Sequence, residues 1–376
     1  MYYPRPGSEM AIYFSTLAHI NAVINGYGCG VAFIGDRGLG KGDISKITRN
    51  PFEKWTNGFQ KNYALVDVDY LTSYFVVKYI KKFGLDGHNL EFVLDDVSQI
   101  IDTRYYTIAA MNTLCELISD KKLGQGTQDV FNDPRGQGLD VKSEKDLTAH
   151  VSSTQVTLAL PNKILDRLKK YYGWENMWMS RILCFFPIHK MADYQRRKYY
   201  INFNPDMPRV PWTDLRENLL NILPRNYPLK LLPLSSEVKS DKDTYFFTHD
   251  RLWGWLRDEN RTSNYYNGFL SANALINGRS EITPTDITTI GLFWPNIILG
   301  AYPCAYQRIV QAIPKCPNVN RLAQELGYNS RKYIYQVLDS VPFGNSLAYC
   351  EDNIVNLIPA FSAVLDRQSE FIKGCL

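Results

Sequence analysis

The feature that most constrains this fold is a short apolar run that ends in a glycine-rich turn carrying one lysine. The run covers residues 31–34, and the turn follows over residues 35–41. These turn residues match the first seven positions of the phosphate-binding pattern G-x-x-x-x-G-K-[ST]. Glycines let backbone N–H groups curl around a phosphate, the next helix directs its positive end at it, and Lys41 adds a full charge. The pattern predicts a strand, a nucleotide-binding loop and a helix, in that order.

The last position of this pattern departs from the rule. Gly42 stands where a Ser or Thr hydroxyl would hold Mg²⁺. The sequence therefore predicts nucleotide binding and leaves open whether the nucleotide is hydrolysed. The residues expected to contact the nucleotide in the loop and at the start of the following helix are Gly35, Gly38, Gly40, Lys41, Gly42 and Asp43.

A second apolar segment, residues 90–94, ends in two carboxylates. This arrangement is typical of a Walker B strand, which supplies the acidic side chains of a nucleotide site. Asp95 would hold Mg²⁺ through water, and Asp96 would position the attacking water. The alternative is a strand that ends in a solvated acidic turn. Because a phosphate-binding loop precedes it along the chain, we favour the functional interpretation.

Further strands and helices alternate along the first half of the chain. Strands are expected over residues 63–69 and 151–160, residues 178–186 lead into another buried strand, and an amphipathic helix is expected over residues 71–83. This alternation predicts an α/β fold in which a parallel sheet carries helices on both faces. The polar, glycine-containing residues 124–145 interrupt it, either as a long mobile loop or as an inserted hairpin.

This order of elements resembles that of the AAA+ ATPases. The resemblance implies a polar sensor after the fourth strand that orients the lytic water, and Thr157 or Asn162 matches that place best. It also implies an arginine that reaches a neighbouring subunit's nucleotide, and Arg181 matches this role. The alternatives are a strand-end cap for Asn162 and a surface salt bridge for Arg181.

The central part of the chain resembles the helical lid of minichromosome-maintenance and related AAA+ proteins. The resemblance lies in residues 272–287, where Thr283 and Pro284 predict a helix start. In such lids an arginine near the start of the preceding helix senses the γ-phosphate. Arg261 is the nearest candidate, although its spacing differs by about one residue. A proline-rich connection over residues 203–245 precedes a helix expected over residues 252–277.

The last part of the chain carries a helix-turn-helix pattern. Helices are expected over residues 306–313, 318–326 and 331–341, and residues 342–350 would form the hairpin of a winged helix. Arginine and glutamine can read base edges, and lysine and arginine neutralise phosphates. The alternative is a three-helix module that docks on a protein. The residues expected to contact DNA are Arg331, Lys332, Tyr335 and Gln336.

Composition permits a nucleic-acid partner without requiring one, since the formal net charge is +4 and the pI is about 8.5. The seven cysteines are scattered, which favours free thiols in a reducing cytoplasm. No apolar run reaches the roughly 18 residues that a membrane helix needs, and we expect no signal peptide. We therefore expect a cytoplasmic protein without membrane contact, in the host cytoplasm if a virus or plasmid encodes it.

Together these features predict a three-part protein. A nucleotide-binding core covers residues 1–203, a linker and helical lid cover 204–300, and a winged helix-turn-helix covers 301–376. The expected function is an ATP- and Mg²⁺-binding protein that forms a homo-oligomeric ring and acts on DNA, with slow hydrolysis. Two alternatives stay open: a nucleotide switch without catalysis, and an adaptor that binds a protein partner through its C-terminal domain.

Overall fold

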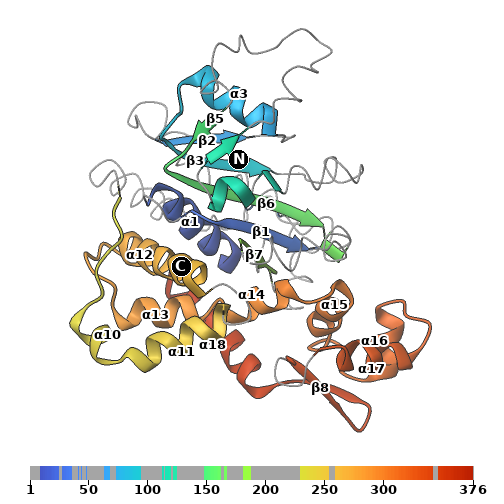
Figure 1. Cartoon of the computed structure of the whole chain (residues 1–376). Helices are drawn as coiled ribbons and strands as arrows, with labels where there is room; N and C mark the ends of the chain where they lie inside the picture. The colour runs from blue at the N-terminus through green and yellow to red at the C-terminus, as the bar shows by residue number, and fades with distance from the viewer. Residues whose placement is uncertain are drawn as a thin grey trace, which may run out of the picture.

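A five-stranded parallel sheet lies at the centre of the computed structural model (Figure 1). Its order is β2–β3–β6–β1–β7, formed by Tyr63–Asp67, Asn89–Leu94, Ser153–Pro161, Gly30–Gly35 and Ile182–Phe185. The structure describes residues 9–24, 28–35, 41, 44, 48, 63–67, 73–94, 112–113, 115–119, 122–124, 148–161, 165–166, 181–187, 229–253, 259–341 and 346–375. Within these residues, the predicted α/β parallel sheet with flanking helices is confirmed.

The strand order creates a switch point between β1 and β6. From β1 the next strand along the chain is β2, at the far edge of the sheet. From β6 the next sheet strand is β7, on the opposite side of β1. The chain therefore leaves these two adjacent strands in opposite directions, and ligands of open parallel sheets bind in the crevice that such a divergence opens at the carboxyl ends. Gly35 and Pro161, the last residues of β1 and β6, are register partners there.

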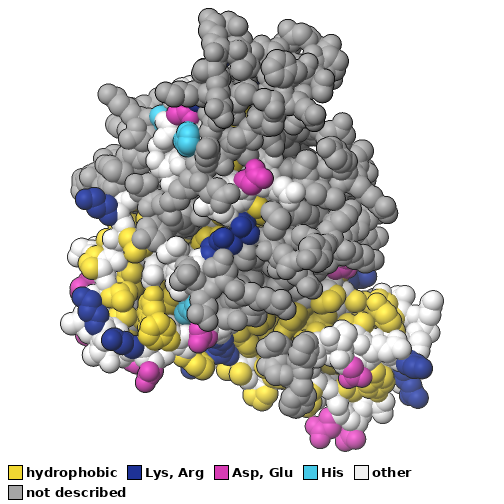
Figure 2. Space-filling view, in the orientation of Figure 1, with side chains coloured by type: hydrophobic (Ala, Val, Ile, Leu, Met, Phe, Trp, Pro, Cys, Tyr) yellow, Lys and Arg dark blue, Asp and Glu magenta, His cyan; other side chains and the backbone are white. Residues whose placement is uncertain are grey.

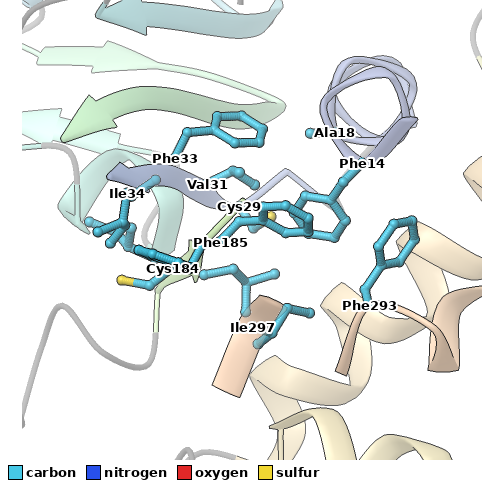
Figure 3. Packing of buried hydrophobic residues seen from close by; sticks show 14 of the residues in the cluster. Phe14, Ala18, Cys29, Val31, Phe33, Ile34, Cys184, Phe185, Phe293 and Ile297 are labelled. Atoms are coloured by element: carbon cyan, nitrogen blue, oxygen red, sulfur yellow. The ribbon is translucent and has the colours of Figure 1, made fainter. Parts of the chain in front are cut away.

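Helix α1 (Glu9–Val23) lies between the sheet and a layer of C-terminal helices. It packs against β3 and β6 on one side and against α12 (Glu259–Ile276) and α18 (Pro359–Cys375) on the other. Residues 10–23 are all buried, as expected of a helix enclosed on every side. Phe14 shows this enclosure in Figure 3, since its ring centroid lies 4.5 Å from that of Phe185 in β7 and 4.9 Å from that of Phe293.

Helix α3 (Ser73–Phe83) confirms the predicted amphipathic segment, with Val76, Val77 and Ile80 fully buried. The sequence pattern of residues 107–123 predicts one helix, but the structure shows that this helix does not extend to residue 123. Residues 115–119 are helical, but Lys122–Gly124 form β4, which pairs antiparallel with β5 (Thr148–His150). The segment predicted as a loop or an inserted hairpin is thus joined to the core by a two-stranded ladder. Residues 125–147 lie outside the described part.

The helices after the sheet begin earlier than predicted. Residues 203–245 were expected to form a connection, yet α10 (Ser236–Ser240) and the start of α11 (Lys242–Trp253) lie within them. The predicted helix 252–277 is instead the end of α11 and a separate α12. The missed signals are two side-chain caps. The Ser235 hydroxyl accepts a hydrogen bond from the Val238 amide, and the Asp241 carboxylate accepts one from the Thr244 amide.

The segment that resembles a helical lid, residues 272–287, has a structural role of its own. Thr283 begins α13 (Pro284–Gly291) in a capping box with Asp286, which confirms the predicted helix start. The Asp286 carboxylate is fully buried, forms an ion pair with Arg279 and accepts a hydrogen bond from Asn273 at 2.7 Å. Asn273 in turn accepts one from the Tyr13 hydroxyl at 2.7 Å. This network joins α12 and α13 to α1.

Helix α14 (Trp294–Ala301) covers the edge strand β7. Asn296 behaves as a strand partner there: its side-chain amide donates to the Phe186 carbonyl at 2.9 Å, and its own carbonyl accepts from the Phe186 amide at 3.0 Å. A Cβ on Gly300 would lie 2.3 Å from the Cys184 carbonyl oxygen, so only glycine permits this approach. Gln368 of α18 donates to the Asn296 side chain at 2.7 Å. The edge of the sheet is therefore paired and covered.

The C-terminal unit consists of three short helices and a hairpin. The helices are α15 (Cys304–Ala312), α16 (Val319–Glu325) and α17 (Arg331–Asp339), and the strands are β8 (Ala348–Glu351) and β9 (Ile354–Leu357). The hairpin predicted over residues 342–350 was placed too early in the chain. Asp352 and Asn353 adopt φ values of 49° and 60°, which suits a tight two-residue hairpin turn.

Candidate functional site

The carboxyl end of β1 holds a nearly buried lysine. Lys41 is helical and 8% exposed, and its ammonium donates to the carbonyl oxygen of Gly35 at 2.8 Å. Its charge is thus directed back over the end of the strand, at the switch point of the sheet. The other loop residues predicted to contact nucleotide lie outside the described residues, namely Gly38, Gly40, Gly42 and Asp43.

Two further strands end at this edge. β3 ends at Leu94, directly before Asp95 and Asp96 in the sequence, and β6 ends at Pro161, directly before Asn162. The three predicted site residues lie outside the described part of the chain. Because β1, β3 and β6 are parallel, their last described residues, Gly35, Leu94 and Pro161, all lie at the carboxyl end of the sheet.

Thr157 does not fit the sensor position. In the register of the sheet it is the partner of Val31, near the amino end of β1 and four positions before the Gly35–Pro161 pair. At about 3.3 Å per residue, this puts it about 13 Å from the strand end. Its hydroxyl is buried and donates to the Glu91 carboxylate at 3.4 Å. Of the two residues that the sequence left open, Thr157 is therefore far from the strand end, and Asn162 lies outside the described residues.

Arg181 lies at the opposite end of the sheet. Its carbonyl accepts a hydrogen bond from the Gly30 amide at 2.8 Å, which fixes it beside the first residue of β1. Its guanidinium is half-buried and donates to the Ser119 hydroxyl. β1 is about 17 Å long at 3.3 Å per residue. Arg181 therefore cannot reach a phosphate held by Lys41 of the same chain, and the predicted contact with a nucleotide would require a second subunit.

Arg261 also lies towards the amino ends of the strands. α12 runs antiparallel to α1, since Asn273 bonds Tyr13 whereas Phe269 stacks on Phe14 at 4.8 Å. The start of α12 consequently lies near the end of α1, just before the chain enters β1. Within one chain Arg261 is thus placed with Arg181 and away from Lys41. A contact between Arg261 and a γ-phosphate requires a second subunit.

A buried polar network beneath α1 was missed at the sequence level. His19 Nδ1 lies 2.6 Å from Glu91 Oε1, and both side chains are fully buried. The Tyr63 hydroxyl donates to the same carboxylate, and His19 Nε2 lies 3.0 Å from the hydroxyl of Thr48. Ser15 lies 2.8 Å from that hydroxyl. The available signal was Glu91 itself, a lone carboxylate inside an apolar strand, which must have a partner when buried.

The four residues of the C-terminal unit that were predicted to contact DNA differ in their exposure to solvent. Arg331 and Lys332 are exposed at the start of α17, and Gln336 is exposed further along the same helix. Tyr335 was expected on the same exposed face, but it is half-buried and its hydroxyl donates to Asn353 in the hairpin turn at 2.9 Å. Acidic side chains lie on the same unit, and Figure 2 shows both charges over it. The exposed acidic residues of this unit are Glu325, Asp339, Glu351 and Asp352.

Comparison with protein-family models and with curated proteins found no match for this chain. The fold and the arrangement of the site are thus the basis for any functional assignment. No helix in the described part of the chain combines the length and the apolar character needed to cross a bilayer.

Proposed function

We propose that the chain binds ATP at the carboxyl ends of β1, β3 and β6. The observation that carries this proposal is the position of Lys41, a lysine 8% exposed whose ammonium lies 2.8 Å from the Gly35 carbonyl at the switch point of the sheet. A nucleotide phosphate can take the place of that carbonyl as the partner of the ammonium. Charge-assisted contacts of this kind are roughly twice as strong as neutral hydrogen bonds.

The residues around this end fit a Mg²⁺–ATP complex in part. Asp95 would hold the metal through water and Asp96 would position a water for attack, while Mg²⁺ neutralises charge on the phosphates. Gly42 supplies no hydroxyl to the metal. The proposed activity is therefore ATP binding with slow hydrolysis, in which the nucleotide acts mainly to hold subunits together.

The proposed assembly depends on different groups lying at the two ends of the sheet. The phosphate end of one subunit and the arginine-bearing end of the next would meet head to tail, a heterologous contact that closes into a ring or leaves an open one. Arg181 of one subunit then completes the site of its neighbour.

The first prediction concerns molecular mass in solution. With ATP and Mg²⁺ we expect a multiple of the 43.3 kDa chain, and with ADP or no nucleotide the single chain. At 100 times its dissociation constant, ATP should also stabilise the folded protein by about 2.7 kcal/mol. Mass measured by light scattering and unfolding measured by urea titration check both results. If millimolar ATP produces neither assembly nor stabilisation, the proposal is contradicted.

A turnover assay with and without DNA separates the three functional classes. DNA-stimulated hydrolysis indicates a motor or initiator. ATP binding without turnover indicates a nucleotide switch. The absence of both ATP binding and turnover indicates an adaptor that retains the fold but does not use nucleotide.

We also propose that the C-terminal unit is a winged helix that contacts DNA. Three helices followed by a hairpin, with basic residues at the exposed start of the third helix, support this assignment. The acidic residues of the same unit instead favour a protein partner, so the charge of α17 must be tested directly.

The second prediction is a change in salt dependence. Replacing Arg331 and Lys332 together by alanine should weaken DNA binding and lower the slope of log affinity against log salt by about 2, since each phosphate contact contributes about 0.9. Binding is measured by fluorescence anisotropy at several salt concentrations. The double variant Lys239→Ala/Lys242→Ala removes the same charge from exposed positions of α10 and α11 and is the matched control. Equal slopes for both variants would favour the protein-docking alternative.

A further inference from the structure

Helix α17 exposes an aromatic ring next to a lysine and a glutamine. The Tyr333 side chain is 42% exposed, although tyrosine can bury most of its ring. Lys332 and Gln336 are exposed on the same helix. Gln336 follows Lys332 by four positions and Tyr333 by three, and residues at these spacings are neighbours on a helix surface. The three side chains therefore form one stripe on α17.

The Tyr333 ring is oriented by a second tyrosine. Tyr328, in the segment between α16 and α17, packs against it with the ring centroids 4.8 Å apart and the ring planes at 74°. Edge-to-face contacts of this kind are favourable and fix the relative orientation of the rings. The ring is thus held in place while much of its surface stays exposed. Such a surface suits stacking with a nucleic-acid base, because every base has a π-face.

The hairpin beside α17 carries charge of the opposite sign. It lies next to the helix, since the Tyr335 hydroxyl donates to Asn353 in the hairpin turn at 2.9 Å. Residues 346–358 contain no lysine or arginine, whereas Glu351 and Asp352 are exposed. A duplex carries phosphates on both strands, so it brings charge to both sides of a helix that enters its groove. The two carboxylates would repel that backbone, and they disfavour a duplex on this unit.

We propose that the C-terminal unit binds single-stranded DNA, with Tyr333 stacked on an unpaired base, Lys332 at a phosphate and Gln336 at a base edge. This inference rests on the proposed DNA contact of the unit and names the form of DNA that it takes. A single strand brings one backbone, which follows the basic start of α17 and avoids the acidic hairpin. The glutamine amide both donates and accepts, so it can bond the edge of an unpaired base. Stacking tolerates any base, so the preference is for unpaired DNA and not for a sequence.

Variants at Tyr333 test the stacking contact. Fluorescence anisotropy measures the affinity of the full chain for a labelled oligothymidylate and for a duplex of the same length, and we expect tighter binding of the single strand. Tyr333→Ala should weaken binding of the single strand by roughly 10- to 100-fold, the range for losing one stacked base. Tyr333→Phe keeps the ring and should bind normally. Tyr333→Leu fills similar space without a π-face and should behave as the alanine variant does.

Two controls separate stacking from charge and from general surface effects. Tyr349→Ala removes a tyrosine that is 44% exposed on β8 of the same unit, and it should leave the affinity unchanged. Lys332→Ala should lower the slope of log affinity against log salt for the single strand by about 0.7. Tyr333→Ala should lower the affinity without changing this slope, because the ring carries no charge.

The outcomes distinguish this inference from the proposed function on which it rests. If the duplex binds as tightly as the single strand, or if Tyr333→Ala and Tyr349→Ala cause equal losses, the proposed single-strand site is overturned while the DNA contact of the unit stands. If the unaltered chain binds neither form of DNA, the DNA contact itself fails, and the C-terminal unit is better explained as a protein-docking module.

Discussion

Replacing His19 by leucine is expected to lower the free energy of unfolding by about 3 kcal/mol, because the buried Glu91 carboxylate loses one of its polar partners. The imidazole lies 2.6 Å from the Glu91 carboxylate, and neither side chain is exposed to solvent. Leucine is similar in size to histidine, so the loss arises mainly from leaving Glu91 buried with one partner fewer. Urea titration of both proteins measures the difference.

A double-variant cycle isolates the pair. Because His19→Leu/Glu91→Leu removes both partners, its loss should be smaller than the sum of the two single losses. Thr16→Ala is the matched control: Thr16 is buried in the same helix, but its hydroxyl bonds only the Ile12 carbonyl, at 2.9 Å. We expect it to cost about 1 kcal/mol. Strictly additive single losses, or a His19→Leu effect no larger than that of Thr16→Ala, would contradict the assigned interaction.

The His19–Glu91 network also connects the sheet to helical residues that follow Lys41 in the chain. Thr48 lies 3.0 Å from His19 and bonds the Ile44 carbonyl, also at 3.0 Å, one turn earlier. Both residues are helical and follow Lys41 in the chain. The polar groups beneath α1 therefore fix the positions of Ile44 and Thr48, which follow Lys41 in the chain. If Lys41 binds a phosphate as proposed, loss of this network should weaken both folding and nucleotide binding.

The order of the sheet strands could not be derived from the sequence, although the strands themselves could. Apolar runs such as residues 90–94 define each strand because they are buried on both faces. Nothing in those runs states that β6 lies between β1 and β3. That arrangement depends on long-range packing, including the contacts of α1 with β3 and β6 on one face.

The candidate site likewise has one part that the sequence could predict and one part that depends on the fold. Lys41 could be predicted as a candidate site residue, because the pattern that identifies it consists of residues adjacent to it in the sequence. The placement of Arg181 and Arg261 at the same end of the sheet could not, since they come from separate elements and that placement depends on the packing of α12 on α1. The sequence resemblance assigned Arg261 to a helical lid. Only the structure shows that this residue lies towards the amino ends of the strands.

Replacing Lys41 by alanine is expected to weaken ATP binding by about 100-fold. Its ammonium is directed at the end of β1 and would contact the β- and γ-phosphates. Two charge-assisted hydrogen bonds contribute about 3 kcal/mol or more, and each 1.4 kcal/mol corresponds to a factor of ten. Isothermal titration calorimetry with ATP and Mg²⁺ measures the loss.

The choice of nucleotide sharpens this test. AMP lacks the phosphates that Lys41 would contact, so the same substitution should change AMP affinity several-fold at most, whereas a general disruption of the loop would weaken both nucleotides alike. Lys242→Ala removes an equal charge from an exposed position on α11 and controls for net charge. If Lys41→Ala binds ATP as tightly as Lys242→Ala does, the carboxyl end of β1 is not a phosphate site. The assembly model would then lose its basis, because it needs a nucleotide at that end of each subunit.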